Sequence, residues 1–166
     1  MKINIAPLTV TDTRTIDNDK SGGILVNKFK DANHNLIERK ICKDNKDDIV
    51  IILKEWLKNE KIDVIITTGG TGLTGRDITP EALNEVAEKH IPGFGEIFRN
   101  ISIKTVGTSA IQSRACAVLS NGKYIFALPG SSGGVTDAWE GILKHQLDIN
   151  HKPCNFVELF PRLKEK

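Results

Sequence analysis

One run of β-branched residues limits the folds open to this chain more than any other feature. The residues from Asp63 to Thr68 read Asp-Val-Ile-Ile-Thr-Thr and end at a pair of glycines. Such a run is typical of a strand that is covered on both faces, as strands are in a parallel sheet with helices on either side. It therefore predicts a central strand of an α/β protein whose carboxyl end opens into a glycine-rich loop.

The segments before this run alternate between strand and helix patterns. Apolar, β-prone residues predict strands at 3–10 and 36–42, although Pro7 indicates an irregularity or a missing neighbour in the first. A helix is expected over about 22–33, with Ser21 as its cap. The helix after the second strand carries an apolar stripe made of Ile49, Ile52, Leu53, Trp56 and Leu57.

Three helices are expected after the run. Thr79-Pro80-Glu81 predicts the first, with Thr79 as the cap, proline in the first turn and glutamate at the positive helix end. A second is expected at 94–103, after Pro92-Gly93 has ended the first. The last should span about 133–148, and the polar tail from Asn150 should lie over the body of the protein.

A hairpin completes the predicted sheet. Two β-prone runs, 114–119 and 123–128, flank Asn121-Gly122, the strongest short hairpin signal. We expect this antiparallel pair at one side of the sheet. The alternation elsewhere implies parallel strands covered by helices. The sequence thus predicts one domain over residues 1–166, a three-layer α/β/α sandwich with a mostly parallel, partly mixed sheet.

Composition argues against several classes of protein. The formal net charge is only +2 and aromatic residues make up 5%, which disfavours nucleic-acid binding. No apolar stretch reaches the roughly 20 residues that a membrane-spanning helix needs, and the N-terminus lacks a signal-peptide pattern. The three cysteines are widely spaced without a Cys-x-x-Cys pair, which argues against a disulfide framework or zinc site. We expect a cytoplasmic protein that neither binds nucleic acid nor enters a membrane.

The loop Thr68-Gly69-Gly70-Thr71-Gly72 is the strongest candidate for ligand binding. Ligands of open α/β sheets gather at the carboxyl ends of the strands, and glycines there let backbone amides approach an anion. The segment nearly matches the dinucleotide and Walker patterns, but the helix begins too late for the first, and Arg76-Asp77 replaces Lys-Ser/Thr of the second. The remaining readings are a phosphate cradle or a plain tight turn.

Two acidic residues stand near this cradle. Asp77 follows the glycines, and Asp44 follows the strand at 36–42, which places both at the same sheet edge. A carboxylate beside a phosphate would repel it unless a divalent cation lay between them, so the pair predicts a magnesium site with a catalytic role. The alternatives are that Asp77 caps a turn and that Asp44 favours a helix N-terminus.

Polar residues of other loops are candidates for ligand contacts. Thr11-Asp12-Thr13-Arg14 and Ser21-Gly22-Gly23 form a polar rim after the first strand, and Ser113 precedes the hairpin. A second glycine-rich loop, Leu128-Pro129-Gly130-Ser131-Ser132-Gly133-Gly134, separates a strand from the last helix, with Pro129, Gly130 and Ser131 as candidates for ligand contacts. Ser131 or Ser132 either binds the ligand or caps that helix.

Several of these motifs, taken in order, resemble one known family. They are Thr68-Gly69-Gly70-Thr71-Gly72, Arg76-Asp77-Ile78-Thr79-Pro80-Glu81, Pro92-Gly93-Phe94-Gly95-Glu96, Ser113-Arg114 and Leu128-Pro129-Gly130. Together they are similar to the molybdopterin-binding domain family of molybdenum cofactor biosynthesis proteins, to which gephyrin and plant Cnx G domains are related. The ending Lys152-Pro153-Cys154-Asn155-Phe156 is most similar to the MoaB branch. Ser131-Ser132 departs from the Asn-Pro that many members carry.

The resemblance implies a function as well as a fold. It implies adenylyl transfer from ATP to molybdopterin with Mg²⁺, which yields adenylyl-molybdopterin and pyrophosphate. Asp77 matches the catalytic aspartate of the family motif, and Asp44 matches a second acidic position. The glycine loop and Ser113-Arg114 match binding motifs, and members assemble as trimers or hexamers. The alternatives are a non-catalytic molybdopterin-binding or scaffold protein, and a generic nucleotide or sugar-phosphate enzyme.

Overall fold

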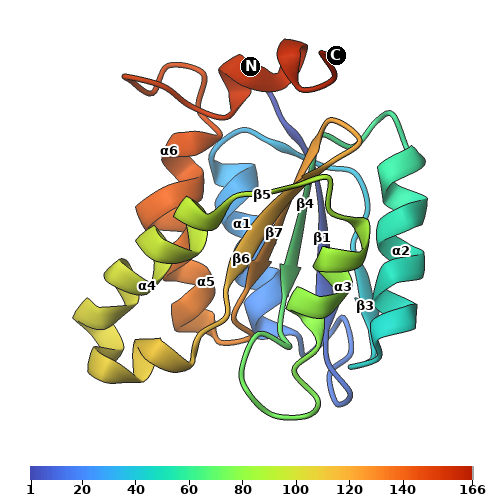
Figure 1. The fold of residues 1–166 in the computed structure, drawn as a ribbon, viewed down its shortest axis with the longest axis vertical. Coiled ribbons are helices and arrows are strands. Elements are labelled where there is room, and N and C mark those ends of the chain that lie inside the picture. Colours follow the sequence, from blue (N-terminus) through green and yellow to red (C-terminus); the bar gives the residue numbers. More distant parts are fainter. Residues whose placement is uncertain (166) are drawn as a thin grey trace.

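The computed structural model describes residues 1–165, and it confirms the three-layer α/β/α sandwich (Figure 1). Parallel pairing runs from β2 and β3 through β1 and β4 to β7, and β6 and β5 continue the sheet in antiparallel pairs. The strands described are β1 (Asn4–Val10), β2 (Asn35–Leu36), β3 (Lys40–Cys42), β4 (Val64–Thr68), β5 (Lys89–His90), β6 (Cys116–Ser120) and β7 (Lys123–Leu128).

Helices cover both faces of this sheet. One face packs against α1 (Lys20–Asp31), α4 (Pro92–Val106) and α5 (Ser132–Ala138), and the other against α2 (Lys46–Lys58) and α3 (Thr79–Val86). Every residue of β4 is buried, because its side chains enter the two cores alternately. The double-sided burial that the β-branched run predicts is therefore confirmed.

The hairpin prediction is also confirmed. Asn121 and Gly122 have φ angles of 46° and 69°, the positive values that a tight turn between twisted strands requires. The pair lies farther inside the sheet than predicted, because β7 pairs with β4 and the two-residue strand β5 adds an outer edge. No sequence pattern indicated β5.

The predicted strand at 36–42 is two short strands. β2 pairs with β1 at Asn4 and Ile5, and β3 pairs with it from Leu8 to Val10. Pro7 lies opposite the break, so the missing neighbour that its lack of an N–H predicts is confirmed.

Two helix caps differ from the predictions. Asp19, not Ser21, caps α1, since its carboxylate accepts a hydrogen bond from the amide of Gly22. Thr79 does not cap α3; its hydroxyl donates to the carbonyl oxygen of Gly69 at 2.8 Å. Aspartate and serine cap helices about equally well, so sequence alone does not choose between Asp19 and Ser21.

The last predicted helix is continuous but irregular. It comprises α5, a π-helical segment η2 (Trp139–Leu143) and α6 (Lys144–Gln146). The tail carries the 3₁₀ helix η3 (Val157–Arg162) and lies across the amino ends of the strands, opposite the glycine loops (Figure 1). A further 3₁₀ helix, η1 (Gly107–Gln112), follows α4. None of the helices in the described part of the chain is long and apolar enough to cross a membrane.

Candidate active site

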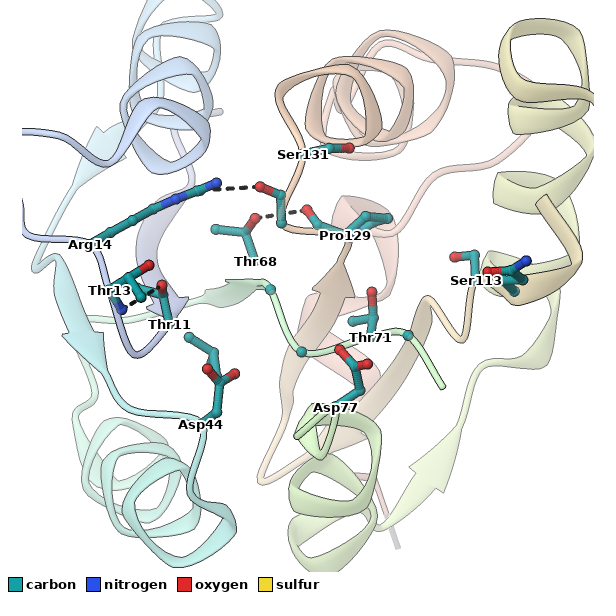
Figure 2. Close-up of a pocket in the computed structure, with 16 residues that line it drawn as sticks. Thr11, Thr13, Arg14, Asp44, Thr68, Thr71, Asp77, Ser113, Pro129 and Ser131 are labelled. Carbon is teal, nitrogen blue, oxygen red and sulfur yellow. Dashed lines mark hydrogen bonds between the residues drawn. The ribbon is translucent and has the colours of Figure 1, made fainter. Parts of the chain in front are cut away.

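A polar cavity of about 600 Å³ opens at the carboxyl ends of β1, β4 and β7, the edge where open α/β sheets bind ligands. Its size is within the range of small-molecule sites. Figure 2 shows how loops from distant parts of the sequence surround it. The predicted site residues that line it are Thr11, Asp44, Thr68, Gly69, Gly70, Thr71, Gly72, Asp77, Ser113, Pro129, Gly130 and Ser131.

Glycine is required twice in the loop after β4. Gly69 and Gly70 have φ angles of 105° and 66°, in the left-handed region that residues with a Cβ rarely adopt. A Cβ atom on Gly69 would also overlap the carbonyl oxygen of Val10, and one on Gly70 would overlap the hydroxyl of Thr79. Close packing against Val10 and Thr79 therefore fixes the conformation of this loop, which also borders the cavity.

The backbone amides of this loop are divided between the protein and the cavity. The amide of Gly69 donates to the carbonyl oxygen of Leu128 at 3.0 Å, and that of Gly72 is directed to the Asp77 carboxylate. Within residues 1–165, the amides of Gly70 and Thr71 donate to no protein acceptor. The predicted phosphate cradle therefore offers two adjacent amide donors, which can bind two oxygens of one phosphate group.

Asp77 is fixed in position by the loop that carries it. Its Oδ2 accepts hydrogen bonds from the amide of Thr74 at 2.8 Å and from the hydroxyl of Thr74 at 2.7 Å. Burial alone would raise the pKa of Asp77, but these bonds and the amide of Gly72 hold it below its usual value. Asp77 therefore caps a turn, as the structural alternative states, and also presents an ionised carboxylate to the cavity.

Asp44 lines the cavity from the loop before α2. Burial and the negative charge of Asp12 raise the pKa of Asp44, and Asp77 adds to this effect. Arg76 offsets part of this charge and forms an ion pair with Asp12. Neighbouring carboxylates repel one another, and a bound cation would offset this repulsion.

The donor set suits magnesium in the presence of a phosphate ligand. No group of three or more His, Cys, Asp or Glu side chains within residues 1–165 is arranged to hold a metal ion by itself. Magnesium, however, is commonly bound by one or two carboxylates together with substrate phosphates and water. Asp44 and Asp77, which line one cavity beside two free amides, fit that pattern.

Arg114 does not line this cavity, contrary to its predicted role in binding. Its Nε donates to the carbonyl oxygen of Gly72 at 2.7 Å, and its Nη2 donates to that of Asp77 at 2.6 Å. The guanidinium also pairs with Glu81 in the first turn of α3. Of the family motif Ser113-Arg114, Ser113 lines the cavity. Arg114 instead stabilises the conformation of the loop from 72 to 77.

Ser21 and Gly22 also lie outside the cavity, contrary to prediction. A Cβ atom on Gly22 would collide with the carboxylate of Asp19, and Ser21 is buried. The side chain that reaches the cavity from this region is Arg14. The sequence predicts only a polar rim over Thr11-Asp12-Thr13-Arg14 and does not single out Arg14, because a loop residue has no periodicity that reveals where its side chain points.

The second glycine-rich loop closes the cavity on the α5 side. The hydroxyl of Thr68 donates to the carbonyl oxygen of Pro129 at 2.8 Å. Gly130 lies against Gly69, since a Cβ atom built on Gly130 would come within 3.2 Å of the Gly69 Cα. Ser131 caps α5 by accepting from the amide of Gly134, so the capping role is confirmed. Ser131 also lines the cavity, and its contact with a ligand stays a prediction.

Comparison with known proteins places this geometry in a family. The model of the probable molybdopterin binding domain matches residues 7–149. Molybdenum cofactor biosynthesis protein B of Escherichia coli K12 is 41% identical over 161 residues, covering 97% of this chain and 93% of that protein. The protein of the same name from Staphylococcus aureus MRSA252 is 44% identical, with 88% of each covered.

Solved structures agree with the sequence comparison. A crystal structure of Molybdenum cofactor biosynthesis protein B superimposes with a TM-score of 0.90 at 35% identity, over 100% of this chain and 98% of the other. The tungsten cofactor synthesizing protein MoaB from Pyrococcus furiosus gives a TM-score of 0.79 at 34% identity, over 88% and 92%. The chain therefore belongs to the molybdopterin-binding domain family, as a MoaB/MogA-like member.

Proposed function

We propose that this protein acts in molybdenum cofactor biosynthesis by transferring an adenylyl group from ATP to molybdopterin. The observation that carries the proposal is the cavity itself. Two free amides of a glycine loop, Gly70 and Thr71, lie in the same cavity as two carboxylates, Asp44 and Asp77. The names of the relatives, which refer to molybdenum cofactor biosynthesis, support the same assignment.

The reaction joins two phosphate-bearing substrates. The terminal phosphate of molybdopterin attacks the α-phosphorus of ATP, a new P–O–P bond forms, and the bond to the bridging oxygen breaks. Pyrophosphate leaves with that oxygen and its electron pair. No side-chain nucleophile is required, so catalysis consists of positioning the two phosphates in line and stabilising their charge.

Each feature of the cavity then has a role. The amides of Gly70 and Thr71 donate to phosphate oxygens, and the hydroxyls of Thr11 and Thr68 border the same space. Asp44 and Asp77 would hold Mg²⁺, which when bound neutralises phosphate charge and acts as a Lewis acid. Asp77 is suited to this because its pKa is lowered, so it is ionised at neutral pH.

Pyrophosphate release tests the proposal directly. The purified protein is incubated anaerobically with molybdopterin, ATP and Mg²⁺, and pyrophosphate is measured with a coupled enzyme assay. We expect release that depends on all three components, and formation of adenylyl-molybdopterin in equal amount. Tight molybdopterin binding without pyrophosphate would contradict the adenylyl transfer and favour a binding or scaffold protein of the same pathway.

A further inference from the structure

The cavity is electrically asymmetric. Among the described residues that line it, Arg14 is the single cation, while Asp44 and Asp77 are the anions. Figure 2 shows Asp44 on the loop beside α2 and Asp77 on the loop beside α3, whereas Arg14 extends along the opposite wall toward the loop of Ser131. The two walls therefore suit different ligands, because a carboxylate pair attracts a metal-bound phosphate and an arginine attracts a free one.

The guanidinium of Arg14 is held by one nitrogen only. Nη1 donates to the hydroxyl oxygen of Ser21 at 2.9 Å and to the carbonyl oxygen of Gly130 at 3.2 Å. Within residues 1–165, Nε and Nη2 donate to no protein acceptor. These two nitrogens form one edge of the guanidinium, and such an edge binds two oxygens of a phosphate at once.

A buried carboxylate keeps this arginine in place. Asp19 has a fully buried side chain and lies 3.8 Å from Nη1 of Arg14. Its carboxylate accepts from the hydroxyls of Thr9 at 2.5 Å and Ser21 at 3.3 Å, and from Nη2 of Arg39 at 3.0 Å. Burial would raise the pKa of Asp19, but these bonds lower it, so the carboxylate is ionised. Ser21 thus connects a fixed negative charge to Arg14.

We propose that Arg14 binds the phosphate monoester of molybdopterin through its Nε and Nη2 edge, and that Asp19 and Ser21 act as positioning residues for it. This inference rests on the proposed adenylyl transfer and extends it, because it assigns the pterin to the α1 and α5 side of the cavity. The triphosphate is then left to the side of Asp44 and Asp77. Attacking and accepting phosphates approach each other across the glycine loop.

The test compares phosphorylated with dephosphorylated ligand. Dissociation constants of molybdopterin and of phosphatase-treated molybdopterin are measured by anaerobic calorimetry for wild type, Arg14→Gln and Arg14→Lys. Lys46→Gln is the matched control, because it removes one positive charge at the same sheet edge from a side chain that pairs with Glu85 outside the cavity.

Arg14→Gln should weaken binding of the phosphorylated form about 10- to 100-fold, the usual effect of losing a charge-assisted pair. Arg14→Lys should lie between wild type and Arg14→Gln, because it keeps the charge and loses the planar edge. The dephosphorylated form should bind all four proteins alike. Equal weakening of both forms, or no weakening, would overturn the assignment.

Two further arms separate this inference from the proposed function. ATP with Mg²⁺ should bind Arg14→Gln as it binds wild type, and a loss confined to ATP would place the nucleotide, not the pterin, at Arg14. If wild type binds no molybdopterin, the proposed function is wrong. Inorganic phosphate then tests Arg14 by itself. It should raise the Tm of Arg14→Gln less than that of wild type and of Lys46→Gln, because only the amides of Gly70 and Thr71 remain to bind it. An equal rise in all three proteins would overturn the assignment.

Discussion

The two ends of the sheet differ in how their hydrogen-bond donors are paired. At the amino end, the ammonium group of Lys123 is nearly buried and donates to the carbonyl oxygens of Asn59 and Ile62, at 3.0 and 2.5 Å. The tail packs over that end, where the ring of Tyr124 lies against that of Phe156. At the carboxyl end, the amides of Gly70 and Thr71 have no protein acceptor among the described residues and border a cavity.

This difference separates polar groups that stabilise the fold from polar groups that bind a ligand. A buried donor is costly unless it is paired, so the amino end pairs its donors within the protein. Donors at the carboxyl end can bond to water or to a ligand. The loops around them are kept in place by hydrogen bonds such as those of Thr68 and Thr79. We therefore expect substitutions of the paired groups at the amino end to change stability, and substitutions of the ligand-facing groups at the carboxyl end to change function. Gly69 lies at the carboxyl end but packs against Val10, so its substitution should change stability.

Asp77→Asn should have the largest effect. An asparagine oxygen still accepts the hydrogen bonds of Thr74, so the turn is kept, while the charge that would hold Mg²⁺ is lost. We expect turnover to fall about 100-fold or more, the scale on which single electrostatic groups act in catalysis, with molybdopterin binding retained. Steady-state pyrophosphate release measures the effect, and wild-type turnover in this variant would remove Asp77 from the mechanism.

Gly69→Ala should destabilise the protein by about 3 kcal/mol, because the new methyl group meets the Val10 carbonyl at a φ of 105°. Gly75→Ala is the matched control in the same loop, since a Cβ atom there meets nothing within 4 Å. Urea unfolding monitored by fluorescence compares the two variants. If both were equally stable, the packing role assigned to Gly69 would be wrong.

Lys123→Met should cost about 2 kcal/mol of unfolding free energy, because two buried carbonyl oxygens lose their donor. The molybdopterin dissociation constant should not change, since Lys123 begins β7 at the end opposite the cavity. Chemical denaturation and calorimetry on the same preparation provide both values. If Lys123→Met changed molybdopterin affinity and left stability unchanged, the proposed difference between the two ends of the sheet would be wrong.

Much of this organisation could be predicted from local sequence. The β-branched run ending at Thr68 predicts burial on both faces from its composition alone. Asn121-Gly122 predicts a hairpin because few residues tolerate positive φ at both turn positions. Asp44 and Asp77 could be placed at one edge, because parallel strands end together. These inferences need only the chemistry of a few adjacent residues.

The remainder depends on contacts between distant segments. The two-residue strand β5 is too short to produce a pattern, and whether Ser21 or Asp19 caps α1 depends on Thr9 and Arg39. Arg114 donates to loop carbonyl oxygens and does not line the cavity, whereas Arg14 lines it, although both are arginines on loops. The trimer or hexamer stays a prediction, because it depends on contacts between chains.

The central claim is that the free amides at the carboxyl end bind the substrate phosphates. An amide-detected NMR titration with molybdopterin, and separately with ATP and Mg²⁺, tests it residue by residue. We predict that at least one ligand moves the Gly70 and Thr71 amide signals downfield, while the Gly69 amide, already bonded to Leu128, and the Lys123 amide change little. Saturating ligand with unmoved Gly70 and Thr71 signals would contradict the account.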